Sequence, residues 1–317
     1  MQDKWGIQLK VLKHVNIWSN MTVNELVEEM KNAGFQALNL AESIDVLTNM
    51  IQDKACTKFL GLAGALVPGG MREVIVKIIR KHFIDVVITT GANLTHDLIE
   101  AFGEHHYHAK KPINDVQLFE SKLNRIYNVL LPNKGYVILE KNLQQIFTKL
   151  PQKKMSSKEF LYNLGKEIKD EKSIIKVATE ENIPIFCPSI SDSILGFQIW
   201  MYSQDQKFTV NTTLDHKDML DIAFKSERSG ALIIGGGVPK HFIAMAMQTT
   251  PRALNYAVQI TMDRPEAGGV SGAKLEEAKS WKKVAKDAEV ADLICDATIA
   301  LPIIVANLLN KMKKSQQ

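Results

Sequence analysis

The chain has 317 residues, of which 45% are hydrophobic and 23% charged, and its net charge at pH 7 is +4. These proportions are typical of a globular protein, and the scattered lysines argue against nucleic acid as a partner. The three cysteines lie far apart without a CxxC spacing, so neither a disulfide framework nor a zinc site is expected. Residues 1–10 have no apolar run behind them, and no later stretch is long enough to span a bilayer. We therefore expect a cytoplasmic protein with no membrane contact.

The length suits either one large α/β domain or two smaller ones, and no Pro/Gly/Ser-rich linker marks a boundary. We therefore predict a single domain over residues 1–317, with a helical N-terminal extension. Between residues 20 and 60, apolar residues recur at helical spacing, which predicts helices there. The apolar positions are Val23, Leu26, Val27, Met30, Ile44, Val46, Leu47, Met50 and Ile51.

Four strand–helix units follow along the chain. Each begins with a short apolar or β-branched run and passes through small or polar turn residues into an apolar or amphipathic segment. The predicted strands are Asp85–Thr90, Ile183–Cys187, Ala231–Ile234 and Ala291–Cys295. Continuous apolar strands that alternate with helices indicate a parallel sheet covered on both faces. The sequence thus predicts a doubly wound, mostly parallel, Rossmann-like α/β fold.

Polar or glycine residues follow all four predicted strands. They are Thr90, Asp192, Gly235–Gly237 and Asp296. Ligands of doubly wound sheets bind beyond the carboxyl ends of the strands, so these residues predict one binding cleft. Gly235–Gly237 before a helix would let backbone N–H groups approach an anion, although the run is not GxGxxG and also suits a plain turn. Thr89–Asn93 suits either a ribose or pyrophosphate site or a capped strand-to-helix connection.

The histidines of the chain lead to two different expectations. His105, His106 and His108 stand beside Glu104 in a polar connecting segment without a second ligand pair at helical spacing. This arrangement predicts a surface loop, and no metal site is predicted. His241 lies at the start of the helix after the glycine run, where it would point toward the cleft. It is either a catalytic base or an ordinary polar helix residue.

The segment Ser271–Lys283 is the richest in candidate functional residues. On a helix, Glu277 and Trp281 would share one face and offer a carboxylate and an indole to an alkylammonium group. Lys283 would then point elsewhere, so a catalytic interpretation requires the helix to end near Trp281 or Lys282. The alternative is an amphipathic helix whose lysines are solvated.

Together these residues resemble deoxyhypusine synthase, from about Gly34 to Leu309. The motifs that carry the resemblance are Pro68–Arg72, Asp85–Thr90, Asn124–Ile126, Leu130–Asn133, Gly235–His241, Ser271–Ala273, Glu277, Ser280–Trp281 with Lys283, and Asp296–Ala297. Several long motifs in the same order are far more specific than a single glycine loop.

The resemblance implies a homotetramer with NAD sites at subunit interfaces, acting on spermidine and on one lysine of translation factor 5A. Its reaction oxidises spermidine with NAD, releases 1,3-diaminopropane and passes the butyl imine through the enzyme lysine to the factor. Lys283 matches that lysine and His241 the base. Glu277, Trp281 and Ser271 are expected on the polyamine side. The expected cofactor residues are Gly64, Thr90, Gly91, Ala92, Asp192, Gly236, Gly237, Asp263, Asp296 and Ala297.

The sequence departs from the eukaryotic pattern of this family at several positions. His96 and Phe197 stand where an acidic residue and an aspartate are found, and Lys282 where a glycine is common. Met245, Gln259 and Val270 replace an asparagine, a tyrosine and an aspartate. Because carboxylate partners for a cationic substrate are missing, the preferred polyamine is open. A polyamine aminobutyltransferase of the homospermidine synthase type, or a catalytically silent subunit that assembles with an active paralogue, remains an alternative.

Overall fold

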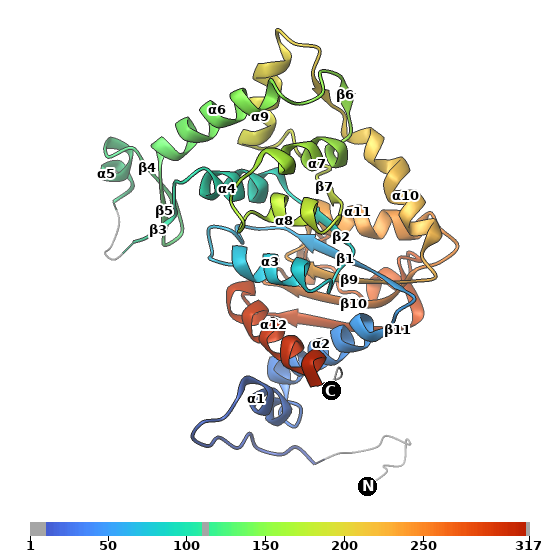
Figure 1. The fold of residues 1–317 in the computed structure, drawn as a ribbon. Helices are drawn as coiled ribbons and strands as arrows, with labels where there is room; N and C mark the ends of the chain where they lie inside the picture. The colour runs from blue at the N-terminus through green and yellow to red at the C-terminus, as the bar shows by residue number, and fades with distance from the viewer. Residues whose placement is uncertain (1–10, 110–113, 315–317) are drawn as a thin grey trace.

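The computed structural model describes residues 11–109 and 114–314, so the charged first ten residues lie outside it. Its centre is a six-stranded parallel sheet in the order β11-β10-β9-β1-β2-β7 (Figure 1). The strands are β1 (Cys56–Leu62), β2 (Val86–Thr89), β7 (Ile185–Phe186), β9 (Arg228–Ile234), β10 (Leu254–Thr261) and β11 (Val284–Ile294). In chain order within this sheet, the strands run 3-2-1-4-5-6, which is the doubly wound Rossmann order. The predicted fold class is therefore confirmed.

Helices connect these strands. They are α1 (Val23–Met30), α2 (Phe35–Gln52), α3 (Arg72–Arg80), α4 (Gly91–Ala101), α5 (Asp115–Glu120), α6 (Asn133–Phe147), α7 (Ser157–Glu167), α8 (Ile174–Glu180), α9 (Ile194–Ser203), α10 (Asp215–Lys225), α11 (Gly237–Gln248) and α12 (Ala297–Lys314). Helix α1 starts at a capping box, in which Thr22 and Glu25 satisfy each other's backbone N–H groups. Helices α1 and α2 confirm the helices predicted between residues 20 and 60 as far as Gln52. Residues 56–60 belong instead to β1.

Successive residues of the central strands face opposite sides of the sheet, as the pleat requires. In β9, Leu232 and Ile234 pack in the cluster formed with α2, α3 and α12. Ala231 and Ile233 pack in the second cluster, with α10 and α11. Figure 1 shows α2 and α12 on one side of the sheet and α10 and α11 on the other. Both faces of the sheet are thus buried, as the continuous apolar strands predict.

All four predicted strand–helix units are present, but β1 and β10 were not predicted. Each carries a polar residue inside an otherwise apolar run. Lys58 in β1 forms an ion pair of 2.8 Å with Asp85 and donates to the Cys56 carbonyl. Gln259 in β10 is buried and hydrogen bonded. These tertiary contacts satisfy the polar side chains of Lys58 and Gln259. In the sequence, the same side chains make the two segments differ from the continuous apolar run of a buried strand.

Two smaller sheets lie outside the central one. An antiparallel sheet has the order β3-β5-β4, with β3 (Tyr107–His108), β4 (Leu123–Ile126) and β5 (Val129–Pro132). We call this sheet the flap, because its residues overhang the candidate site described below. A short parallel pair joins β6 (Lys154–Met155) to β8 (Thr209–Val210). Among the described residues, no helix is both long and apolar enough to cross a membrane.

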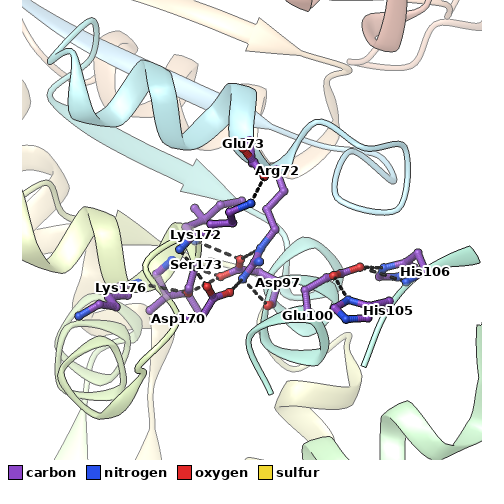
Figure 2. A network of polar contacts seen from close by, with 12 residues as sticks. Arg72, Glu73, Asp97, Glu100, His105, His106, Asp170, Lys172, Ser173 and Lys176 are labelled. Carbon is purple, nitrogen blue, oxygen red and sulfur yellow. Dashed lines mark hydrogen bonds and ion pairs between the residues drawn. The ribbon is translucent and has the colours of Figure 1, made fainter. Parts of the chain in front are cut away.

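A buried carboxylate joins three helices beside the sheet (Figure 2). Asp97 of α4 is fully buried and accepts a 2.7 Å bond from Arg72 of α3. It also accepts from the Ser173 hydroxyl and from the first backbone N–H groups of α8, at Ile174 and Ile175. The negative charge at the N-terminus of α8 is favourable, and every acceptor position is used. This network fixes α4, which supplies residues to the candidate site.

Asp97→Asn tests this support. The substitution removes the charge that faces Arg72 and places an amide donor against backbone donors, so we expect a loss of roughly 3 kcal/mol or more in the free energy of unfolding. The matched control is Asp115→Asn, which breaks an exposed ion pair with Arg125 and should cost far less stability. Urea unfolding of both variants checks the contrast. Equal, small losses would contradict it.

Candidate functional site

Two cavities meet at the point where the strand order of the sheet reverses, between β1 and β9. Cavity A, of about 710 Å³, lies beyond the carboxyl ends of β9, β10 and β11, where Gly235, Thr261 and Asp296 line it. Cavity B, of about 350 Å³, lies beyond β2 and β7. Both are lined by residues 63–65, which follow β1. This is the expected ligand position in a doubly wound fold.

Most of the expected cofactor residues line these cavities. Gly64 lines both; Thr90, Ala92, Asp192 and Gly237 line cavity B; and Asp296 and Ala297 line cavity A. Three others do not line either cavity. Gly91 lies against Ser193, where a Cβ would come 2.3 Å from the hydroxyl oxygen. Gly236 lies against Ser271, and Asp263 is exposed just after β10.

The glycine run forms a tight loop that closes on Ser271. Gly235 and Gly237 have φ values of 74° and 52°, in the left-handed region that favours glycine. A Cβ at residue 236 would come 2.4 Å from the Cα of Ser271. The Gly237 N–H donates to the Ser271 hydroxyl at 2.8 Å. Ser271, expected on the polyamine side, therefore anchors the loop at the start of α11.

A buried lysine extends this anchor, and no sequence pattern pointed to it. Lys240 of α11 is 5% exposed and donates to the side-chain oxygen of Gln259 and to the Ala273 carbonyl. The Gln259 amide in turn donates to the carbonyls of Gly235 and Ser271, at 2.9 and 2.7 Å. Burial lowers the pKa of Lys240 to about 8, against the opposing pull of nearby carboxylates. Gln259 thus connects Lys240 to the glycine loop and to Ser271 through hydrogen bonds. The family resemblance had suggested a substrate-binding position for it.

The segment that carries Lys283 is not a continuous α-helix. Only Glu277–Lys279 forms a helical turn, of the 3₁₀ type, so the shared α-helical face expected for Glu277 and Trp281 is wrong. Lys282 has φ 57°, and the Lys283 N–H bonds back to the Ala278 carbonyl at 3.0 Å. The helical turn ends before Lys283, which is the condition that the catalytic interpretation required. The left-handed backbone also explains why glycine suits residue 282.

Lys283 lies in an aromatic setting at the start of β11. Its amine is 4.9 Å from the centre of the Trp281 ring, and Trp281 as a residue is 56% exposed. Glu277 is exposed one turn earlier in the segment. The Lys283 carbonyl accepts from the Leu254 N–H, at the amino end of β10. Lys283 therefore lies at the opposite end of the sheet from Asp296. Neither cavity is lined by Lys283, Glu277 or Trp281.

His241 lies on the exposed side of α11, just past its first turn. It is not among the residues that line cavity A or B, although Val238, one turn earlier on the same helix, lines cavity B. Met245, one turn further, lines a small separate pocket between α10 and α11. On the exposed side of α11, His241 thus lies between Val238 at cavity B and Met245 at the separate pocket. Within one chain, the expectation that His241 points into the cleft is not met.

The histidine segment after α4 is only in part the surface loop that was predicted, since His105 and His108 are exposed but other members are not. Glu104 and His106 are buried, and Tyr107 and His108 form β3 of the flap. His106 lines cavity A, together with Tyr127 of the β4–β5 turn. The error arose because polar residues in a connection look solvated when their partners, here Glu100 and Lys134, come from neighbouring helices. Among the described residues, no cluster of three or more acidic, histidine or cysteine side chains is arranged to hold a metal ion.

Comparisons with known proteins place this chain in a defined family. The family model described as "Deoxyhypusine synthase" matches residues 25–308. A probable deoxyhypusine synthase of Methanosarcina thermophila is 44% identical over 303 residues, 96% of each chain. One from Methanothermobacter thermautotrophicus is 39% identical, over 95% of this chain and 98% of its own. A solved structure of a putative deoxyhypusine synthase from Entamoeba histolytica shares the fold, with a TM-score of 0.68 and 18% identity over 94% and 96% of the two chains.

Lys282→Gly tests the turn before Lys283. A residue with a Cβ in the left-handed region costs roughly 1 kcal/mol relative to glycine, so we expect a gain of about that size in the free energy of unfolding. Lys279→Gly is the matched control, because Lys279 lies in the 3₁₀ turn with an ordinary backbone conformation and should lose stability. Thermal unfolding of both variants provides the measurement. A loss in both would show that residue 282 carries no backbone strain.

The buried Lys240 predicts a dependence of stability on pH. Its pKa falls from 10.5 to about 8 on folding, so between these values the unfolded chain binds more protons. The contribution of Lys240 is therefore fully present above pH 10.5 and is lost as the pH falls to 8. We expect the stability of the wild type minus that of Lys240→Met to rise across this window, by on the order of 1–3 kcal/mol. Urea unfolding at several pH values measures it; a constant difference would contradict the assignment.

Proposed function

Since this chain belongs to the deoxyhypusine synthase family, we propose that it is an NAD-dependent deoxyhypusine synthase. It transfers the 4-aminobutyl group of spermidine, through an imine on Lys283, to one lysine of translation factor 5A. The observation that carries this proposal is the turn at Lys282, which frees Lys283 from the preceding helical turn and brings its amine beside the Trp281 ring. An electron-rich ring next to the amine suits a site that takes alkylammonium groups.

The residues of the cleft fit a dinucleotide. Cavities A and B share residues 63–65 as lining, so a ligand with two nucleotide halves could occupy both. Each half has a carboxylate, Asp296 in one and Asp192 in the other, suited to ribose hydroxyls. The Asn93 side chain is 3% exposed beside cavity B, and within the part of the chain that the structure describes neither its oxygen nor its nitrogen has a hydrogen-bond partner. When bound, NAD would take a hydride from the amine substrate and return it at the end.

Three side chains have proposed roles around Lys283. The lysine amine attacks the butyl imine carbon, so that a C=N bond to Nζ replaces the one to the departing amine. Glu277 provides negative charge for the cationic substrate, and Trp281 covers its alkyl chain. His241 accepts a proton from the substrate amine, since a neutral imidazole serves as a base near neutral pH.

A homotetramer with composite sites is part of the proposal. Lys283 lies away from both cavities within one chain, so a second copy of the chain is needed to bring lysine and cofactor together. Helix α9 presents exposed Ile194, Phe197 and Trp200 next to the Asp192 end of the cleft. Exposed apolar surface of this kind marks a protein–protein contact. The contact between copies would thus adjoin the cofactor site.

The identity of the acceptor has one real alternative, a free diamine as used in homospermidine synthesis. Phe197, Met245 and Val270 offer no carboxylate to a second ammonium group, and Gln259 is occupied by Lys240. Fewer fixed charges in the pocket relax the requirement for a particular polyamine. Transfer to the factor 5A lysine remains the proposal, and the diamine reaction is its competitor.

Trapping tests the lysine intermediate. The protein is incubated with NAD and spermidine, treated with borohydride and digested, and we expect a butylamine adduct on Lys283 by mass spectrometry. Lys283→Arg keeps the charge but forms no imine, so the adduct should disappear and the transfer rate should fall by about 100-fold or more. Lys286→Arg, three residues further along in β11, is the matched control and should behave as the wild type. An adduct on another lysine would refute the role of Lys283.

Incubation of the protein with NAD, labelled spermidine, factor 5A and putrescine distinguishes the two acceptors. Label on factor 5A, and little on added putrescine, is the expected result. Faster formation of labelled homospermidine than of labelled protein would decide for the diamine reaction. Absence of transfer to either acceptor would support a silent subunit.

A further inference from the structure

Three side chains form a hydrogen-bonded chain that joins the flap to the cleft. The Glu100 carboxylate is 2.7 Å from Nδ1 of His106, and Nε2 of His106 is 2.9 Å from Nδ1 of His96. Glu100 and His96 belong to α4, whereas His106 precedes β3. Figure 2 shows Glu100 between His105 and His106, with the carboxylate directed at both rings. The His106 side chain is only 6% exposed, so water does not compete freely for these bonds.

The directions of these hydrogen bonds follow from the charges. Although burial opposes it, the bonds from His106 and His105 lower the pKa of Glu100 to about 2, so its carboxylate only accepts. Nδ1 of His106 therefore carries a proton. Burial and the neighbouring His106 lower the pKa of His96 to about 4, so the His96 ring is neutral. A neutral imidazole has one donor and one acceptor nitrogen, and the bond made by one fixes the other.

His96 is the end of the chain that reaches the cleft. It lines cavity B together with Thr90, Asn93 and Asp192. Among the described residues, its hydrogen bond is made through Nδ1, to His106. When His106 is neutral, its Nε2 accepts from His96 Nδ1, and Nε2 of His96 is left as an acceptor. When His106 is protonated, the direction reverses and Nε2 of His96 becomes a donor.

We propose that Glu100 and His106 are positioning residues that hold His96 as a hydrogen-bond acceptor for a ribose hydroxyl of the dinucleotide in cavity B. This inference rests on the proposed function. A hydroxyl of the ligand donates to His96 Nε2, while Asp192 takes another and the unpaired Asn93 amide gains a partner. A second proton on His106, at Nε2, would reverse its bond to His96 and convert the cavity end from acceptor to donor, while the bond to Glu100 would keep its direction.

Other titratable groups surround the chain. Around His106, which lines cavity A, they are His105, Tyr107, His108, Tyr127, Cys295 and Asp296. Around His96, Asp192 and Tyr136 line the adjoining space. His105 bonds to the second oxygen of Glu100 without reaching His96, and its side chain is 62% exposed. His105 is therefore the matched control, since it shares the carboxylate but lies outside the chain.

Neutron diffraction on the wild-type protein reads the proton positions directly. At a pD of about 8.5, two units above the ordinary pKa of histidine, we expect a deuteron on Nδ1 of His96 and none on Nε2. At a lower pD, a molecule in which Nε2 of His106 also carries a deuteron should have one on Nε2 of His96 and none on Nδ1. A deuteron on Nε2 at the higher pD would overturn the proposal without any variant being needed.

Binding of NAD, measured by calorimetry at pH about 8.5, tests the consequence. His96→Ala should raise Kd about fivefold, the worth of one hydrogen bond, and His106→Leu should do nearly the same. The double variant should bind NAD no more weakly than His96→Ala does, because His106 acts through His96. His105→Ala should stay within about twofold of the wild type. Independent, additive losses, or no loss, would refute the chain.

Failure of this inference and failure of the proposed function give different results. Wild-type protein that binds no NAD would overturn both. NAD binding with normal formation of the Lys283 adduct, but without any effect at His96, would overturn the inference alone. An NAD analogue without the ribose hydroxyls of the half in cavity B should bind the wild type and His96→Ala equally. A remaining difference would point to packing as the role of His96.

Discussion

The buried contact between Lys240 and Gln259 is the constraint on which the candidate site depends. This contact holds four parts of the chain as one unit: the first turn of α11, β10, the glycine loop, and the segment with Ser271 and Ala273 that leads from β10 to Lys283. A buried ammonium group is costly unless its donors are met, so removal of either partner would loosen all four elements at once. The same unit holds the glycine loop close against Ser271.

The parallel sheet separates the two halves of the proposed chemistry. The proposed cofactor residues gather at the carboxyl ends of the strands, where successive loops converge, whereas Lys283 directly precedes β11 at its amino end. The bulge in β11 between Val284 and Glu289 then carries the chain back into register with β10. Within a single chain, lysine and cleft remain apart. The proposed assembly of copies would bring the two together, and the exposed aromatic side of α9 offers it a surface.

Local sequence patterns were sufficient for the fold class and for much of the cleft. The strand ends at Thr90, Asp192 and Asp296 could be predicted because small or polar residues directly after a buried strand are typical of the ligand-binding edge of a parallel sheet. β1 and β10 could not, because Lys58 and Gln259 are satisfied by distant partners. The turn at Lys282 could not be predicted from hydrophobic periodicity, since no local sequence pattern marks a lysine whose backbone is in the left-handed region. Burial of His106 depends on Glu100, six residues earlier on a helix, which residue composition does not show.

The central claim is that the cleft at the β1–β9 switch point and the Lys283 segment serve one reaction. A crystal structure of the protein with bound NAD tests it most directly. We expect the dinucleotide to span both cavities across Gly64, with one ribose at His96 and Asp192 and the nicotinamide ring next to Lys283 of a second copy. NAD bound elsewhere, or a nicotinamide ring with no Lys283 of any copy within reach, would contradict it.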